Sequence, residues 1–215
     1  MTMTTERLID DLSTKLRAVP RRAVERRLAL SLIVGMVVSG LLMAGSLGIR
    51  ADLASALRGF AFWMKTGYVG TVAALCAAAS VRLAHPDTAP PGWLWLLGLP
   101  VLVVAVLAGL QMANAPPEAW AGLWLGKTWT VCPFLVFGLS IPIFVALTRG
   151  LAKLAPTRLR ATGTLAGLTA GASAALVYCL HCPESTAGFL LVWYSAGIGL
   201  TGLLGALAGP RLLRW

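Results

Sequence analysis

Residues 161–184 read ATGTLAGLTAGASAALVYCLHCPE, a run of small and apolar residues that ends in the tetrapeptide His181-Cys182-Pro183-Glu184. A second apolar run follows at residues 187–209. About 20 consecutive apolar residues are enough to cross the hydrocarbon core of a bilayer, and both runs reach that length. The tetrapeptide is therefore predicted to form a tight turn at a membrane face, between two membrane-spanning helices.

The composition of the whole chain is typical of a membrane protein. Of its 215 residues, 58% are hydrophobic and 12% are charged, and the mean hydropathy is +0.80. A soluble protein of this size needs more polar surface. The formal net charge of +10 does not require nucleic acid as a partner, because Lys and Arg collect on the cytoplasmic loops of membrane proteins. We predict contact with the lipid bilayer and no direct contact with nucleic acid.

Six apolar segments predict an all-α, polytopic membrane protein with a bundle of six transmembrane helices. The expected spans are residues 28–48, 62–81, 93–110, 133–147, 161–180 and 187–209. Together they form a transmembrane domain over residues 28–215, which follows a cytoplasmic N-terminal segment at residues 1–27. Most Lys and Arg then lie on the cytoplasmic side of a bacterial inner membrane. Both termini are expected in the cytoplasm, with Cys132 and Cys182 in the periplasm.

The N-terminal segment contains leucines at every fourth position, with acidic residues beside them. This spacing predicts a short amphipathic helix. An isolated helix of this length is marginally stable in water and needs a surface, either the membrane or a protein partner. The residues alone leave both surfaces open. The apolar and acidic residues that would contact a partner are Leu8, Ile9, Asp10, Asp11, Leu12 and Leu16.

Two Cys-Pro pairs, Cys132-Pro133 and Cys182-Pro183, stand where a helix is expected to start. Proline is favoured at the first helical position, so each cysteine is expected near the positive end of a helix dipole. A thiol in that position ionises more easily, and the thiolate is the nucleophile and the soft metal ligand. In an oxidising periplasm, two neighbouring thiols can close to a disulfide.

Two polar neighbours of Cys182 are candidate supporting residues. Glu184 is expected in the first turn of the sixth helix, where a carboxylate complements the helix dipole. His181 either hydrogen-bonds to the backbone or joins Cys132 and Cys182 as the third ligand of a thiophilic metal ion. The cysteine pair is either a permanent structural disulfide or a sensor of redox state, and the residues alone leave both interpretations open.

Short motifs follow one another in a characteristic order along the chain. They are Leu8 to Leu12, Phe62-Trp63 with Lys65, Gly126 followed by Trp129 and Cys132-Pro133, Ala155 to Arg158, and Leu180 to Glu184 followed by Trp193-Tyr194. In order and spacing, over nearly the whole chain, they resemble the NrsF-type integral-membrane anti-sigma factors of bacteria. The other two cysteines, Cys76 and Cys179, match none of these motifs and are assigned no role.

The resemblance implies a non-enzymatic regulator. Its cytoplasmic N-terminal helix would hold an extracytoplasmic-function (ECF) sigma factor at the membrane. It also implies that Cys132 and Cys182 control the release of that sigma factor under oxidative or heavy-metal stress. No resident cofactor is expected, apart from a thiophilic metal ion acting as the signal.

Two other functions remain as alternatives. A membrane thiol-disulfide oxidoreductase coupled to quinone usually needs two cysteine pairs in relay, and the sequence has only one well-placed pair. A transporter of a small solute or a metal usually carries carboxylates in the middle of the membrane. No Asp or Glu falls inside an expected span.

Overall fold

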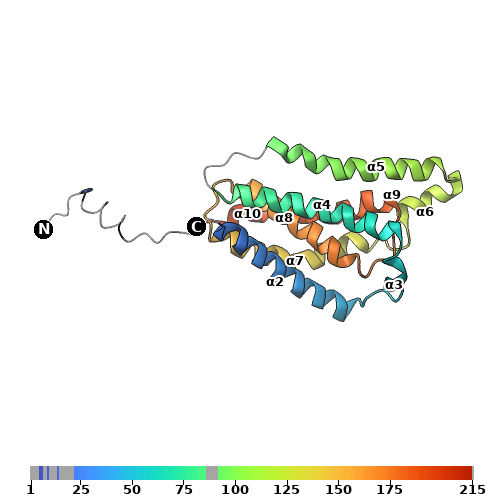
Figure 1. Ribbon diagram of the computed structural model, residues 1–215, viewed down its shortest axis with the longest axis horizontal. Helices are drawn as coiled ribbons and strands as arrows, with labels where there is room; N and C mark the ends of the chain where they lie inside the picture. Colours follow the sequence, from blue (N-terminus) through green and yellow to red (C-terminus); the bar gives the residue numbers. More distant parts are fainter. Residues whose placement is uncertain (1–4, 7–8, 10–13, 15–21, 86–91, 215) are drawn as a thin grey trace.

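The computed structural model describes residues 5–6, 9, 14, 22–85 and 92–214. Over these residues the chain is helical and contains no strand. The long helices lie side by side along one axis, and the short connections gather at the two ends of the bundle (Figure 1). The predicted all-α class is confirmed.

The long helices are α2 (Ala23–Ser46), α4 (Phe60–Leu83), α5 (Gly98–Ala113), α7 (Cys132–Ala152), α8 (Leu159–Tyr178) and α10 (Ser195–Leu212). The short elements are α3 (Leu53–Ala56), η1 (Gly92–Leu97), η2 (Pro117–Ala119), α6 (Trp120–Leu125), α9 (Ala187–Phe189) and the π-helical turn η3 (Leu190–Tyr194). α9, η3 and α10 run on without a break. α7 contains Pro142 and continues beyond the expected end of its span at residue 147.

Within the described residues, five helical segments are long and apolar enough to cross a membrane: Ala23–Ser46, Phe60–Leu83, Gly92–Ala113, Cys132–Ala152 and Ala187–Leu212. α8 is not one of them, although residues 161–180 were expected to be a span of the same kind. Glycine, alanine, serine and threonine replace large apolar side chains over much of its length, which lowers its hydropathy. The count of six spans therefore stays a prediction.

α8 is the central helix of the bundle. It packs against α2, α4, α7 and α10, and most of its residues are buried. Its closest neighbour is α10, because glycines allow the two backbones to touch. A Cβ atom on Gly167 would overlap the carbonyl group of Thr201, and one on Gly171 would lie 2.9 Å from the Cα of Ile198. The glycines of α8 therefore form its packing surface against α10.

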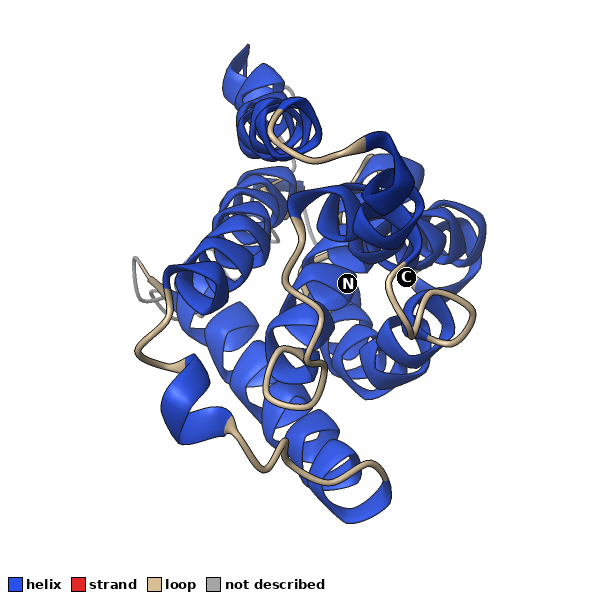
Figure 2. Ribbon diagram, turned by 90° about the vertical axis from the view of Figure 1, so that its right-hand side faces the viewer, coloured by secondary structure: helices blue, strands red, loops and turns tan. Residues whose placement is uncertain are grey.

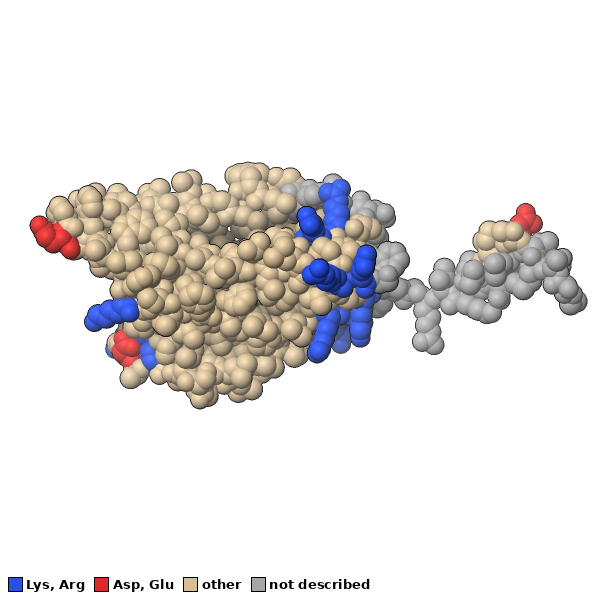
Figure 3. Space-filling model, turned by 180° about the vertical axis from the view of Figure 1, so that it is seen from behind, with Lys and Arg blue, Asp and Glu red and all other residues tan. Residues whose placement is uncertain are grey.

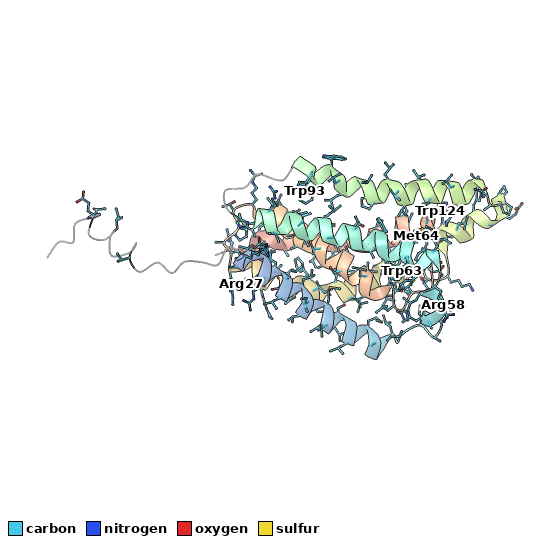
Figure 4. The ribbon with its side chains drawn as sticks, in the orientation of Figure 1. Arg27, Arg58, Trp63, Met64, Trp93 and Trp124 are labelled. Atoms are coloured by element: carbon cyan, nitrogen blue, oxygen red, sulfur yellow. The ribbon has the colours of Figure 1, made fainter. Side chains whose placement is uncertain are left out.

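On the face seen in Figure 3, charged side chains lie at the two ends of the bundle, and its middle shows none. At one end α2 and α8 begin and α4, α7 and α10 finish. Figure 4 labels Arg27 there and Arg58 at the opposite end. We call the first end the basic end, defined by Arg22, Arg26, Arg27, Arg82, Arg149, Lys153, Arg158, Arg160, Arg211 and Arg214.

The opposite end holds the turn between α8 and α9, and its loops cross over the ends of the helices (Figure 2). The connection from residue 111 to residue 131 lies here. It contains η2 and α6, and α6 packs against α9. The Trp193 indole fastens this contact, because its Nε1 donates a hydrogen bond to the Trp124 carbonyl oxygen at 2.9 Å.

The predicted N-terminal helix falls mostly outside the described residues. Of its contact residues, Leu8, Asp10, Asp11, Leu12 and Leu16 lie outside them. Ile9 is described, and its side chain is exposed.

Candidate functional site

Three buried cysteines, one on α7 and two at the end of α8, lie at the end of the bundle opposite the basic end. Cys132 begins α7, Cys179 directly follows α8, and Cys182 lies in the turn between α8 and α9. None of the three has exposed surface, and all are reduced. The thiol groups of Cys132 and Cys182 lie close enough to influence each other's ionisation. We call Cys132, Cys179 and Cys182 the thiol cluster, and this end of the bundle the thiol end.

The chain brings Cys179 and Cys182 together by continuing the hydrogen bonding of α8 for one more turn. The Cys179 N–H donates to the Ala175 carbonyl oxygen at 3.0 Å, and the Cys182 N–H donates to the Tyr178 carbonyl oxygen at 3.0 Å. Residues three apart lie on the same face of such a turn. Pro183 then ends the ladder, because proline has no N–H to donate.

Lys65, on α4, is buried against this turn without exposed surface. Its Nζ donates hydrogen bonds to the carbonyl oxygens of Cys182 at 2.7 Å and Glu184 at 3.0 Å. It lies 5.8 Å from the centre of the Tyr194 ring. A second cation reaches the same place, because Nη1 of Arg50 donates to the Cys182 carbonyl oxygen at 3.3 Å. Two cations from different segments therefore hold the turn.

Two buried tyrosines line the thiol cluster. The rings of Tyr178 and Tyr194 lie 6.0 Å apart between centres. The Tyr194 hydroxyl lies beside the sulfurs of Cys179 and Cys182 and makes no hydrogen bond of good geometry to any described group. Tyr194 is the last residue of the π-helical turn η3, an irregularity that often occurs at functional sites.

A loop closes over the cluster from the α6 side. The Lys127 backbone N–H donates a hydrogen bond to Oε1 of Glu184 at 2.8 Å. Gly126 precedes it with a φ of +57°, a left-handed conformation that favours glycine. A Cβ on Gly126 would lie 2.9 Å from the Glu184 carboxyl carbon and 2.8 Å from Cδ2 of Phe189. Only glycine therefore lets the loop approach this closely.

The surroundings favour the ionised form of Cys182. Its pKa lies below the usual value for a thiol, chiefly because the Cys132 thiol donates a hydrogen bond to its sulfur. Burial acts in the opposite direction, and the positive charge of Lys65 adds to the lowering. Since thiolate is the reactive form, Cys182 is the expected nucleophile of the pair.

Comparisons with known proteins give the family. A family model described as "Negative regulator of sigma F" (NrsF) matches residues 12–215. A "Probable anti-sigma-F factor NrsF" of Azospira oryzae is 42% identical over 214 residues, which cover 99% of this chain and 100% of that protein. The chain belongs to the NrsF family. An "Anti-sigma-F factor NrsF" of Caulobacter vibrioides is 37% identical over 215 residues, with 99% and 100% covered. No solved structure matches the chain.

The two cysteines singled out by the NrsF resemblance lie together, but their settings differ from the expectation. Cys132 opens α7, and Pro133 follows in its first turn, as predicted. Cys182 is not at the start of a helix, because α9 begins only at Ala187. The Cys132 thiol and Lys65 favour its ionised form instead of a helix dipole. Both sulfurs are buried within the fold and do not lie at an open mouth.

The predicted supporting residues have other roles in this NrsF-family chain. Nδ1 of His181 lies 2.9 Å from the Gly48 carbonyl oxygen, which is the backbone hydrogen bond considered for it. Among the described residues, no group of three or more His, Cys, Asp or Glu side chains is placed to hold a metal ion. Cys132, Cys182 and His181 are therefore not assembled as metal ligands. Glu184 lies before α9, not in its first turn, and binds the Lys127 backbone.

Sequence reasoning missed two residues of this site. Lys65 was noted only as part of a motif, although a lysine next to a long apolar run in a membrane protein is itself a signal of function. Cys179 was set aside as a buried thiol, although its three-residue separation from Cys182 places both on one face of a helical turn.

Proposed function

We propose that this chain is a membrane-embedded anti-sigma factor that holds an ECF sigma factor at the cytoplasmic face of the inner membrane. It releases this sigma factor when Cys132 and Cys182 are oxidised. Membership of the NrsF family and the printed names of two full-length relatives support the anti-sigma activity. The contact between the two thiols, at the end opposite the basic end, is the observation that carries the sensing step.

The distribution of charge supports the orientation. Lys and Arg favour the cytoplasmic side of a membrane protein, so the basic end faces the cytoplasm and the thiol end faces the periplasm. The beginning of α2 and the end of α10 both lie at the basic end (Figure 1). The beginning of α2 and the end of α10 lie on the same side of the membrane only if the chain between them crosses the membrane an even number of times. α8 therefore serves as the sixth span, shielded from lipid by its four neighbours.

The predicted N-terminal segment, residues 1–27, ends within the first turns of α2 at the basic end and so belongs to the cytoplasmic side in this proposal. The sigma factor binds there to the face formed by Leu8, Leu12 and Leu16. Asp10 and Asp11 add charge that complements a basic partner.

A mechanical connection joins the thiol end to this segment through α7 and α2. Cys132 is the first residue of α7, and α7 packs along α2. The Ser39 hydroxyl donates a hydrogen bond to the Leu139 carbonyl oxygen at 2.9 Å, and a Cβ on Gly35 would lie 2.6 Å from the Cα of Ile143. A disulfide has strict geometry, so its formation shifts α7, and α2 must follow.

Serine substitution of each cysteine tests the sensing step. In cells with a sigma-dependent reporter, Cys132→Ser and Cys182→Ser should abolish the response to the thiol oxidant diamide while leaving the protein in the membrane. Cys76→Ser is the matched control, because Cys76 is also a buried thiol but lies in the middle of α4, outside the thiol cluster. Normal induction in both cluster variants would reject sensing by this pair.

Deletion of residues 1–20 tests the anti-sigma activity separately. The truncated protein should insert in the membrane, fail to co-purify with the sigma factor and leave the reporter constitutively on. Continued repression would show that the sigma factor binds elsewhere on the protein.

A further inference from the structure

Lys65 is a buried cation without a carboxylate partner among the described residues. The two nearby carboxylates are already engaged. Asp52 accepts hydrogen bonds from Arg50 at 2.7 and 2.6 Å, and the Glu184 carboxylate accepts from the Lys127 N–H. Lys65 donates hydrogen bonds to two carbonyl oxygens, and its Nζ lies over the face of the Tyr194 ring. Carbonyl dipoles only partly replace hydration, so an ammonium group in this position needs a nearby anion.

The thiol cluster is the only other source of negative charge around Lys65 in the described part of the chain. The lysine charge acts on the sulfurs of Cys132, Cys179 and Cys182. Cys182 is held most directly, because its own carbonyl oxygen binds Nζ at 2.7 Å and its sulfur accepts the hydrogen bond of Cys132. Of the three thiols, Cys182 is therefore the one placed to carry the negative charge.

We propose that Lys65 is the counter-ion of a Cys182 thiolate in the reduced protein, and that disulfide formation removes this anion and thereby opens the thiol end. The proposal rests on the redox sensing by Cys132 and Cys182 proposed above. It adds a physical reason why disulfide formation between Cys132 and Cys182 changes the structure of the thiol end. Lys65 acts as a positioning residue and an electrostatic trigger.

The charge balance of the reaction shows that oxidation removes a negative charge from the pocket around Lys65. With a small disulfide RSSR as oxidant, the Cys182 thiolate attacks one sulfur, forms a mixed disulfide and expels RS⁻. Cys132 then loses its proton, and its sulfur attacks the Cys182 sulfur and expels the second RS⁻. The two cysteines lose two electrons and RSSR gains them, giving one RSH and one RS⁻. The negative charge leaves with the product.

After oxidation, the pocket retains the Lys65 ammonium but has lost its anion. Burial of an unpaired charge is strongly unfavourable. Lys65 is the sixth residue of α4, which begins at Phe60, so its head group lies within reach of water at the thiol end. To reach that water it must release the carbonyl oxygens of Cys182 and Glu184, which frees the turn that carries Cys182.

The redox midpoint potential of the full-length protein in detergent tests the proposal, with hydroxyethyl disulfide and its thiol as the redox buffer. Lys65→Gln keeps an N–H donor for the carbonyl oxygens but removes the charge. We expect its equilibrium constant for disulfide formation to rise about tenfold, a shift of about 30 mV to more negative potential. Lys65→Arg should restore the wild-type value. An unchanged potential in Lys65→Gln would reduce Lys65 to a structural donor and overturn the proposal.

A second measurement needs no substitution of Lys65. Thiolate absorbs near 240 nm, so the reduced wild-type protein at neutral pH should show more absorbance there than the Cys182→Ser variant. Equal absorbance would also overturn the proposal. The proposed function has its own test: if Cys182→Ser abolishes the reporter response while the potential is unchanged in Lys65→Gln or the absorbance is unchanged in Cys182→Ser, sensing stands and only the counter-ion proposal fails.

Discussion

At the basic end, the arginines and lysines lie exposed on the surface, whereas at the thiol end Lys65 has no exposed surface and Arg50 is largely buried. The exposed cations are each solvated and form a diffuse charge, which faces the cytoplasm in the proposed orientation. The buried cations both bind the carbonyl oxygen of Cys182, in the turn next to the thiol cluster. Positively charged side chains therefore have different roles at the two ends, and their substitution should change stability by different amounts.

The contact between α8 and α10 joins the two ends, and breaking it should have the largest effect. In Gly167→Val, the new side chain would collide with the backbone of α10, which cannot move aside. We expect a loss of about 3 kcal/mol or more in the free energy of unfolding, measured by thermal unfolding of the full chain in detergent. Gly199→Val is the control, because a Cβ there meets no atom within 4 Å. Similar unfolding midpoints for the two variants would contradict close α8–α10 packing.

Arg50→Gln should have the next largest effect, because it removes a cation that is bound at the thiol end. Arg50 connects the Asp52 carboxylate with the Cys182 carbonyl oxygen. Asp52 is fully exposed, so the expected loss comes from the part-buried hydrogen bond to the Cys182 carbonyl oxygen and is about 1.5 kcal/mol or less. The comparison variant is Arg58→Gln, an exposed arginine at the same end. Equal unfolding midpoints for Arg50→Gln and Arg58→Gln would show that the bound position of Arg50 does not stabilise the fold.

The pH dependence of stability sharpens the comparison further. The pKa of Cys182 is lowered in the folded protein, so the group stabilises the fold fully above the ordinary thiol pKa of about 8.5. This contribution is lost as the pH falls from there through the folded pKa, at no more than about 1.4 kcal/mol per pH unit. The reduced wild-type protein should lose stability over this range relative to Cys182→Ser in chemical unfolding. Parallel pH curves would show that Cys182 is an ordinary thiol.

The sequence was informative where a property is local. Long apolar runs identify helices, because hydropathy is read along the chain, and the all-α class follows. The helical turn before Cys182 shows the limit. The Cys182 N–H bonds back to Tyr178, so Cys182 completes the end of α8 and does not start the next helix. A Cys-Pro pair is compatible with both positions, and only the hydrogen bonds distinguish them.

The parts of the site that the sequence could not predict depend on distant segments. Glu184 binds the Lys127 backbone, 57 residues away. Lys65 occurs next to apolar residues in the sequence, and its burial follows from the side of α4 that faces the turn. α8 illustrates the same point for the fold. Its weak hydropathy is explained by the helices that surround it, since a helix covered by protein does not need large apolar side chains.

The smallest effect is expected at the basic end, where single charges are exposed. Lys153→Gln should change the free energy of unfolding by less than about 0.5 kcal/mol, because an exposed cation exchanges one solvated state for another. Lys65→Gln makes the same chemical change at a buried site, and its unfolding midpoint in the same thermal assay should shift more than that of Lys153→Gln. A large effect of Lys153→Gln would mean that the basic end, too, contains a specific interaction, and the contrast between the two ends would not hold.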